Sequence, residues 1–265
     1  DLVVLRSTWD YTDRLDEFLA WIDRVASVTT VANPAATIRW NTDKHYLDDL
    51  ARRGVAVVPT TFLDAAPNDG PSNDDPPHDA TAVRATLLGV LDTADDDRRE
   101  LVVKPTVSAG PKATARYDAA QLDDAVTHAR RLLAVGRDVM VQPYLSSVDE
   151  AGETGMVLLD GEFSHAFRKG ALLRDGAADV DGLFAVEDIS ATTPGSDERE
   201  LAAEVLVAAT DALDGVAPRY ARVDVLRAAD GAPVLLELEL TEPSFFLWTD
   251  PSAAARVARA VRGWA

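Results

Sequence analysis

The segment that most constrains the fold is residues 219–243, RYARVDVLRAADGAPVLLELELTEP. Two runs rich in valine and leucine flank Asp230-Gly231, a dipeptide that strongly favours a tight hairpin turn. If this dipeptide forms the loop, two pairs of charged residues face each other across the hairpin: Asp224 with Glu237, and Arg222 with Glu239. Because side chains alternate between the two faces of a strand, all four lie on one face of the hairpin.

The two faces of this hairpin are expected to have different roles. The face without charges carries Val223, Val225, Leu236 and Leu238 and is predicted to cover a core. Like charges opposite each other are unfavourable unless something positive lies between them. Three carboxylates and a guanidinium on one small surface therefore predict a divalent-cation site with an anion beside it. A solvated strand face with charges placed by chance is the alternative, and Pro233 in the second run can shift the register.

Length and composition bound the class of protein. The chain of 265 residues can form one large domain or two to three small lobes. No apolar run could span a membrane, and the N-terminus lacks the basic and apolar regions of a secretory signal. With 45 acidic against 26 basic residues, the formal net charge is −19, which repels nucleic acid and anionic membranes. We therefore expect a cytoplasmic protein that binds a small molecule, with neither nucleic acid nor membrane as partner.

Lysine is scarce, so each lysine is a candidate for a specific role as a point charge. The lysines are Lys44, Lys104, Lys112 and Lys169. Lys104 ends a predicted strand before the small-residue loop 106–110, where backbone N–H groups can approach an anion. A strand that ends in a surface lysine is an equal alternative. Lys44, in the first turn of a predicted helix, opposes the helix dipole, and a bound phosphate would explain this placement. Lys169, at a strand end, is a third candidate for the same anion.

Hydrophobic spacing along the chain predicts a mixture of strands, helices and hairpins. The expected strands are 2–5, 28–31, 55–58, 101–104 and 139–142, with a second hairpin over 154–169 that turns at Asp160-Gly161. The expected helices are 13–25, one that opens at Asn41-Thr42-Asp43 and stops at Gly54, 118–135, 197–213 and 251–264. Loops are expected over 65–79 and 175–191. This order predicts α+β lobes and not a doubly wound sheet.

The order of these features resembles that of the ATP-grasp ligases. In that superfamily a lysine opens a helix, a second lysine ends a VVKP-type strand before a small-residue loop, a hinge strand follows, and an acidic hairpin comes last. The interval from Asp224 to Glu237 is similar to the D…E-x-N metal signature of D-alanine–D-alanine ligases and glutathione synthetases. Four segments resemble the branch that contains the O-ureido-serine cyclo-ligase of cycloserine biosynthesis: RSTWDY (6–11), VVKPTVSAG (102–110), GEFSHAFRK (161–169) and LELELTEPS (236–244). Nearly the whole chain is covered, but the likeness is less specific for the substrate than for the superfamily.

The resemblance implies an α+β fold in which two α+β lobes hold ATP between them. Three domains are implied: a pre-ATP-grasp α/β domain over 1–40, a small or lid lobe over 41–146, and a C-terminal lobe with the metal site over 147–265. Because the chain starts within a predicted strand, the first domain is expected to be truncated. A homodimer is one expected assembly.

The resemblance also implies roles for individual residues. Those implied to bind ATP are Lys44, Lys104, Ser108, Gly110 and Lys169 near the phosphates, the hinge Gln142, Pro143, Tyr144 and Leu145 at the adenine, and Glu153 at the ribose. Those implied to ligate Mg²⁺ or Mn²⁺ are Asp224, Glu237 and Glu239. Arg222 and Lys104 are implied to be catalytic, because they stabilise the phosphoryl oxygens. One departure is Glu239, which stands where the family has Asn and adds a negative charge.

The implied activity is that of an ATP-dependent carboxylate–amine ligase or cyclo-ligase that forms an acyl phosphate and releases ADP and phosphate. A kinase of a small metabolite and a non-catalytic ATP-binding regulatory protein are the alternatives. The candidates for binding an amino-acid-like substrate are Arg6, Ser7, Trp9, Asp10 and Ser244. Packing of Trp9 and Tyr11 under the neighbouring helix is an equal interpretation. Asp224→Asn or Glu237→Gln is predicted to abolish turnover with the fold intact, because losing a charge eases repulsion between the carboxylates.

Overall fold

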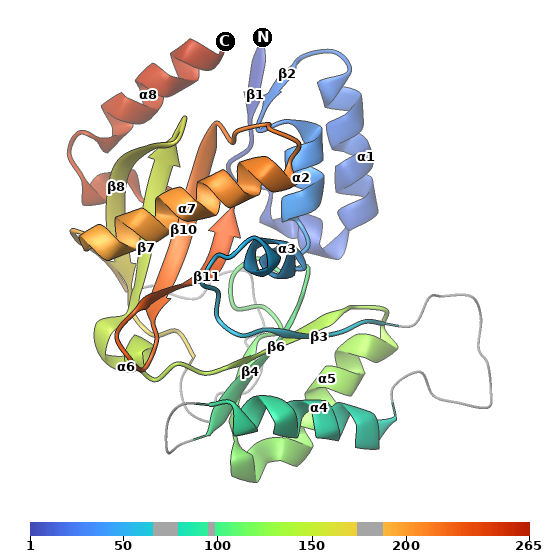
Figure 1. Cartoon of the computed structure of the whole chain (residues 1–265). Helices are drawn as coiled ribbons and strands as arrows, with labels where there is room; N and C mark the ends of the chain where they lie inside the picture. The colour runs from blue at the N-terminus through green and yellow to red at the C-terminus, as the bar shows by residue number, and fades with distance from the viewer. Residues whose placement is uncertain (66–78, 95–98, 174–187) are drawn as a thin grey trace. The chain divides into compact units, whose positions relative to one another are not determined.

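The computed structural model describes residues 1–65, 79–94, 99–173 and 188–265 (Figure 1). Its internal contacts divide the chain into two compact units. Unit 1 comprises Asp1–Val57, Ser147–Ala171 and the described residues from Asp188 onward, and unit 2 comprises the described residues of Val58–Ser146 with Leu172 and Leu173. The three domains implied by the resemblance, 1–40, 41–146 and 147–265, stay predictions.

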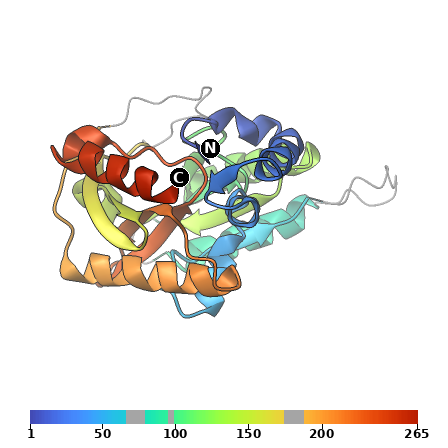
Figure 2. The same cartoon turned by 90° about the horizontal axis from the view of Figure 1, so that it is seen from above.

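The main sheet of unit 1 is antiparallel and contains the acidic hairpin. Its strand order is β11-β10-β7-β8-β9. The strands are β7 (Glu153–Leu159), β8 (Glu162–Lys169), β9 (Ile189–Ala191), β10 (Tyr220–Arg227) and β11 (Pro233–Glu239). Helix α7 (Ser196–Ala212) crosses one face of this sheet and α8 (Ala253–Trp264) lies on the other (Figures 1 and 2). Two short elements, α6 (Ser147–Ala151) and η3 (Leu247–Thr249), flank the strands.

The register predicted for the charged pairs of the hairpin is confirmed. Arg222 pairs with Glu239, and Asp224 pairs with Glu237. Beyond Asp224 the register shifts by one residue, so that Val225 pairs with Leu235 and Leu236 is left as a bulge. The prediction that Leu236 faces the core is therefore wrong, since the bulge puts Leu235 there instead, fully buried.

The turns of the two hairpins differ in length. The β7–β8 hairpin turns at Asp160-Gly161, as predicted, and both residues have the positive φ (49° and 82°) that a tight two-residue turn requires. In the β10–β11 hairpin, Arg227 pairs with Pro233, so residues 228–232 form the loop. The predicted two-residue loop at Asp230-Gly231 is wrong because the bulge at Leu236 shifts the register by one residue, which leaves an odd number of residues in the loop.

The N-terminal part of unit 1 forms a small α/β arrangement. Strand β1 (Leu2–Val4) pairs in parallel with β2 (Thr30–Ala32). The helices are η1 (Trp9–Asp13), α1 (Leu15–Ala26), α2 (Ala35–Asn41) and α3 (Tyr46–Arg52). The helix predicted to open at Asn41-Thr42-Asp43 and to stop at Gly54 corresponds to α3, which starts only at Tyr46, whereas α2 ends at Asn41 and was not predicted. Lys44 therefore lies in the connection between α2 and α3, not in the first turn of a helix. The predicted strand over 55–58 is reduced to one bridge between Val57 and Leu235.

Unit 2 is a four-stranded antiparallel sheet with two helices on one face. The strand order is β3-β6-β4-β5. The strands are β3 (Thr61–Leu63), β4 (Glu100–Pro105), β5 (Ala115–Asp118) and β6 (Val139–Pro143), and the helices are α4 (Ala80–Asp92), η2 (Ala119–Gln121) and α5 (Leu122–Ala134). Val103 and Val141 pack against Leu87 and Leu132 of α4 and α5 in one core. The sequence predicted β4, β6 and α5, whereas β3, α4 and β5 were not predicted.

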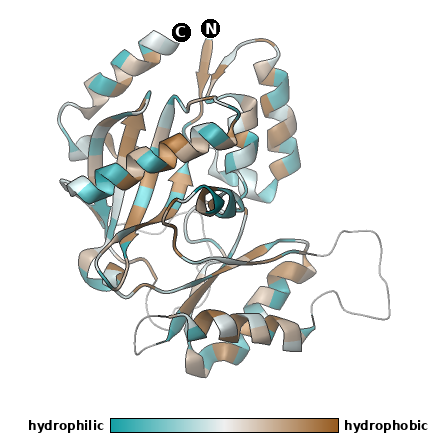
Figure 3. Cartoon of the chain, in the orientation of Figure 1, coloured by the Kyte–Doolittle hydropathy of each residue, from teal (hydrophilic) through white to brown (hydrophobic). Residues whose placement is uncertain are grey.

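Hydrophobic residues dominate the strands of both units, while the helices carry hydrophobic and hydrophilic residues together (Figure 3). None of the helices within the described residues combines the length and the apolar character needed to cross a membrane. Most of the two predicted loops, 65–79 and 175–191, lies outside the described residues.

Candidate active site

One face of the unit 1 sheet carries charged side chains across four adjacent strands. Residues that pair across neighbouring strands lie on the same face, and so do residues two apart on one strand. Glu153 pairs with Lys169 and Arg222 pairs with Glu239, and the pairing of Asp224 with Gly155 connects these two pairs. We call this set the charged grid: Glu153, Lys169, Arg222, Asp224, Glu237 and Glu239. The opposite face of the hairpin is apolar and buried, as predicted, through Val223, Val225, Leu235 and Leu238.

Asp224 is the centre of the charged grid and is fully buried. Arg222 donates to both of its oxygens, from Nε to Oδ1 at 2.9 Å and from Nη2 to Oδ2 at 2.6 Å. Lys169 Nζ lies 3.1 Å from Oδ2. Although burial alone would raise the pKa of this carboxyl, Arg222 and Lys169 hold the pKa of Asp224 well below its usual range. Asp224 is therefore a carboxylate with two cationic partners.

The outer carboxyl groups of the grid are held less firmly in the charged form. Glu239 pairs with Arg222, and Glu153 pairs with Lys169. Burial raises the pKa of Glu239 to about 7 and that of Glu153 to about 8, because these cations only partly offset desolvation. Burial would lower the pKa of Lys169, but Asp224 and Glu153 outweigh it and raise that pKa above its usual range.

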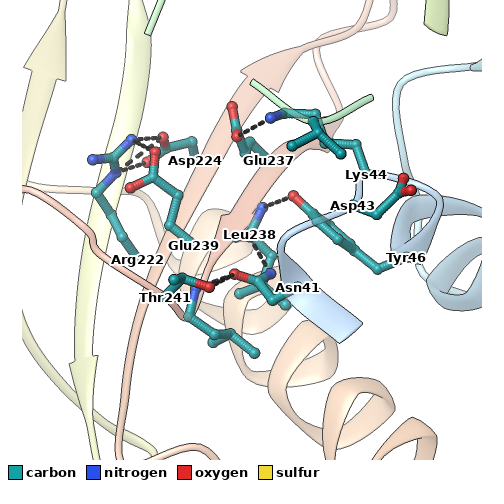
Figure 4. Close-up of polar contacts among 12 residues, drawn as sticks. Asn41, Asp43, Lys44, Tyr46, Arg222, Asp224, Glu237, Leu238, Glu239 and Thr241 are labelled. Carbon is teal, nitrogen blue, oxygen red and sulfur yellow. Dashed lines mark hydrogen bonds and ion pairs between the residues drawn. The ribbon is translucent and has the colours of Figure 1, made fainter. Parts of the chain in front are cut away.

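Lys44 reaches the grid because side chains on both sides of it are fixed to β11. Asn41 Nδ2 donates to the Leu238 carbonyl at 2.7 Å, and Asn41 Oδ1 accepts from the Leu240 N–H at 2.7 Å. The hydroxyl of Tyr46 accepts from the Leu238 N–H at 3.0 Å. These bonds hold the α2–α3 connection against the strand, and Lys44 Nζ lies 3.1 Å from Glu237 Oε1 (Figure 4).

The donor set of the grid fits a hard divalent cation. Carboxylate oxygens are the ligands that Mg²⁺ prefers, and the side chains of Glu237 and Glu239 remain 25% and 26% exposed. Asp224 differs, because both of its oxygens are already engaged. Each carboxylate oxygen has two lone pairs, so a cation can share Oδ1 with Arg222, whereas Oδ2 already faces both Arg222 and Lys169.

The remaining residues predicted to bind ATP lie in unit 2. Lys104 and Gln142 are on the sheet face opposite α4 and α5, and the Gln142 amide donates to the Thr60 hydroxyl at 2.8 Å. The ring of Tyr144 is covered by the Arg116 guanidinium, 3.6 Å from its centroid. Pro143 is the last residue of β6, and Leu145 follows it in the chain. In the loop after β4, Ser108 is buried, whereas Gly110 is exposed and has a φ of 63°. Their roles in binding ATP stay predictions.

The residues predicted to bind substrate lie around η1 and the segment after β11, in unit 1. Trp9 Nε1 donates to the backbone carbonyl of Glu242 at 3.3 Å. Arg6 lies 4.3 Å from the centroid of Phe245, and its Nε is buried without a hydrogen bond. The backbone carbonyl of Ser244 accepts a hydrogen bond from Arg222 at 3.4 Å. Ser7 is exposed, and Asp10 forms an ion pair with Arg14 on the surface. For Tyr11 the packing alternative is confirmed, because its ring stacks on Phe18 of α1.

Sequence reasoning missed two residues beside the grid. Glu242 is 7% exposed, and burial raises its pKa to about 8. The pattern in the sequence that could have indicated Glu242 is a glutamate before a proline, just after an acidic strand. Gly155 pairs with Asp224 across the β7–β10 ladder, and a glycine inside a strand often marks a close approach.

We expect Gly155→Ala to lower the free energy of unfolding by about 2 kcal/mol, in the range for overpacked sites. A Cβ added at Gly155 would meet the ring of Phe167 and lie 3.0 Å from Asp224 Oδ1. Denaturant unfolding measures the change. Gly89→Ala in α4 is the control, because nothing lies within 4 Å of its added Cβ. Equal stability of Gly155→Ala and the wild type would contradict the prediction.

Stability is expected to fall as pH rises from 4.5 to about 8, in part because of Glu242. Its pKa, raised by burial from 4.5 to about 8, means that the folded state keeps a proton that the unfolded state releases in this window. Each such proton costs about 1.4 kcal/mol of stability per pH unit. Glu242→Gln should flatten the dependence when unfolding is measured from pH 5 to 8. Identical slopes for the two proteins would refute this.

Comparisons with known proteins agree with this architecture. A family model described as the N-terminal domain of D-cycloserine synthetase DcsG matches residues 1–33. The cycloserine biosynthesis protein DcsG of Streptomyces lavendulae is 40% identical over 263 residues, which is 98% of this chain and 82% of that protein. The crystal structure of D-cycloserine synthetase DcsG superposes with a TM-score of 0.85 at 39% identity, covering 99% of this chain and 83% of that one.

A more distant structure extends the likeness in fold. The ATP-grasp ligase PsnB, complexed with a phosphomimetic variant of its minimal precursor, Mg and ADP, has a TM-score of 0.59 at 18% identity, covering 99% of this chain and 77% of that one. The predicted α+β ATP-grasp fold is confirmed by these matches. The chain therefore belongs to the DcsG family and is an ATP-dependent ligase of the ATP-grasp fold.

Proposed function

We propose that this ligase activates the carboxylate of a small amino-acid-like substrate with ATP. In this reaction the carboxylate attacks the γ-phosphorus, which gives an acyl phosphate and ADP. An amine, in the same or a second molecule, then displaces phosphate to form an amide or a ring. The observation that carries the proposal is the charged grid, in which carboxylates suited to a divalent cation lie beside Arg222.

The residues of unit 1 have separable tasks in this proposal. Glu237, Glu239 and Asp224 would hold Mg²⁺, which supplies charge neutralisation and orientation to the triphosphate when bound. PsnB, with its bound Mg and ADP, supports this choice of cofactor. Arg222 places a guanidinium where phosphoryl oxygens gain charge, and Lys44 adds a second positive group next to Glu237.

The residues of unit 2 are proposed to bind the rest of the nucleotide. Lys104 would neutralise phosphate oxygens, aided by backbone N–H groups of the loop that contains Ser108 and Gly110. The segment from Gln142 to Leu145 would form the hinge against the adenine. Glu153, which belongs to unit 1, would hold the ribose hydroxyls.

No protein nucleophile is needed for this chemistry, which agrees with the absence of cysteine from the chain. Catalysis would then consist of positioning and charge neutralisation. The name of the relative DcsG, D-cycloserine synthetase, supports a ring-forming reaction on an amino-acid derivative. We therefore place a cyclo-ligase first among the ligases.

The test is a screen for ADP and phosphate release with Mg-ATP over serine, alanine and O-ureido-serine in both enantiomeric forms. The expected result is ADP and free phosphate in equal amounts, together with an amide or ring product that mass spectrometry identifies. A phosphorylated final product would show a kinase instead. Binding of ATP without ADP release for any compound would overturn the proposal.

Arg6→Ala is expected to raise KM for the carboxylate substrate about 30-fold and to leave KM for ATP unchanged. Within the described residues, the guanidinium of Arg6 forms no ion pair and lies over Phe245, so it can receive a substrate carboxylate. A hydrogen bond to a charged group contributes about 1.5–3 kcal/mol, which sets this magnitude. Arg24→Ala, which removes an exposed arginine in the last turn of α1, is the control. An unchanged KM for the carboxylate would rule out this role.

A further inference from the structure

Glu242 is a buried carboxyl group that the ion pairs of the charged grid leave without a cation. It is the third residue after the end of β11 and is 7% exposed. It takes part in no ion pair within the described part of the chain, and its side chain interacts with that of Tyr11, a residue that is itself 5% exposed. Burying a carboxylate without a cation is costly, so such a group calls for a ligand or a function.

The surroundings of Glu242 connect the charged grid to the residues predicted to bind substrate. Leu240, two residues before Glu242, donates its N–H to Asn41 Oδ1 at 2.7 Å, and Asn41 belongs to the segment that fixes Lys44 beside Glu237. On the other side, Trp9 is tied to the backbone carbonyl of Glu242 at 3.3 Å. Glu242 therefore lies where a substrate held near η1 would meet the groups around the triphosphate.

A nitrogen-bearing group matches this environment better than another anion would. Carboxylates already crowd this side of the grid, and Lys44, which also acts on Glu242, is paired with Glu237. A neutral or protonated amine can donate hydrogen bonds to the Glu242 carboxyl group and gains from the surrounding negative charge. The Tyr11 hydroxyl interacts with the same carboxyl group and is a second polar group at this position.

We propose that Glu242, next to Tyr11, is the subsite for the substrate nitrogen that attacks the activated carboxylate, and that the Glu242 carboxylate, formed once the group has released its own proton, accepts the proton of that nitrogen. This inference rests on the proposed function. In the step, the nitrogen lone pair forms the C–N bond and the bond from the acyl carbon to the phosphate oxygen breaks. Phosphate leaves with that electron pair, and one N–H proton passes to Glu242.

Hydroxylamine separates this role from ATP binding and acyl-phosphate formation. It traps an acyl phosphate as a hydroxamate from solution and needs no subsite for the substrate's own nitrogen. With Mg-ATP and O-ureido-serine, Glu242→Gln should form hydroxamate within about threefold of the wild type, yet form the amide or ring product about 100-fold more slowly. Tyr11→Phe should slow product formation about fivefold and leave hydroxamate formation unchanged.

Glu198→Gln is the matched control. Glu198 is also a buried glutamate of unit 1, 6% exposed, but it accepts from the Gly195 N–H at the start of α7. This variant should match the wild type in both assays. Product formation by Glu242→Gln at the wild-type rate would overturn the inference, and so would an equal loss of hydroxamate and product in a folded Glu242→Gln. Failure of the proposed function looks different, because the wild type itself would then release no ADP and form no hydroxamate.

Discussion

Glu237→Gln is expected to lower ADP release about 1,000-fold while the free energy of unfolding stays within about 1 kcal/mol of the wild type. A metal-binding carboxylate supports several kcal/mol of transition-state stabilisation, and about 1.4 kcal/mol corresponds to a factor of ten in rate. The stability changes little because the Glu237 side chain is 25% exposed, so solvent screens its pairing with Lys44.

Steady-state ADP release at saturating ATP and denaturant unfolding measure the two effects. Glu162→Gln is the matched control, because Glu162 is an exposed glutamate at the start of β8 in the same sheet. It should leave both quantities unchanged. ADP release by Glu237→Gln within tenfold of the wild type would exclude Glu237 from the metal site. Partial rescue by Mn²⁺ would support a ligand role for Glu237.

Asp224→Asn is expected to abolish ADP release and also to lower the free energy of unfolding by about 3–5 kcal/mol. Asp224 is fully buried between Arg222 and Lys169, so its neutralisation leaves two buried cations with too little counter-charge. Breaking a buried ion pair by removing one partner has costs of this size. The sequence had suggested the opposite, that the fold stays intact because repulsion is relieved. The structure reverses that sign, since attraction to cations dominates at Asp224.

A double variant separates the two effects of Asp224. Replacing Lys169 by Met as well removes one of the stranded cations, so Asp224→Asn/Lys169→Met should recover at least about 1 kcal/mol of the lost stability. Its ADP release should remain as low as that of Asp224→Asn alone. Recovered activity in the double variant would contradict the assignment of Asp224 to the catalytic site. If Asp224→Asn were as stable as the wild type, the ion pairs of Asp224 with Arg222 and Lys169 would not stabilise the fold as proposed.

The register of the acidic hairpin was predictable because it depends on local information. Alternation of charged and apolar side chains assigns the faces of a strand, and a turn dipeptide fixes approximately which residues face each other. Arg222 therefore met Glu239 as expected. Pro233 indicated that the register of the second strand can shift, and the structure confirms a shift, but the sequence did not locate the bulge at Leu236. It changed the loop and the core residue but left the charged pairs in place.

The placement of Lys44 depended on long-range contacts that sequence spacing does not report. Asn41 reads locally as a helix cap, yet its amide bonds the backbone of a strand about 200 positions later in the chain. The predicted helix therefore starts only at Tyr46, and the connection between α2 and α3 places Lys44 beside Glu237. Glu242 was missed for the same reason, because its distinctive property is deep burial against Tyr11.

Helix α4 was missed for a different, local reason. Its sequence contains a glycine and several β-branched residues, which lower helix propensity, and its apolar spacing is weaker than that of α5. Packing of Leu87 and Leu91 into the core of unit 2 stabilises it nonetheless. Tertiary burial thus outweighed intrinsic propensity in this segment.

The bonds from Asn41 and Tyr46 to β11 also affect how this protein behaves toward other copies of itself. β11 is the outermost strand of its sheet, and an exposed edge strand can recruit further strands and start aggregation. Side-chain groups occupy the outward N–H and C=O of Leu238 and the N–H of Leu240, and the carbonyl of Ala56 accepts the N–H of Leu235. Unlike a backbone segment, the amide of Asn41 and the phenol of Tyr46 do not offer a row of backbone groups with which a further strand could pair. The α2–α3 connection, which holds Lys44 beside Glu237, thereby prevents further strands from adding to the β11 edge.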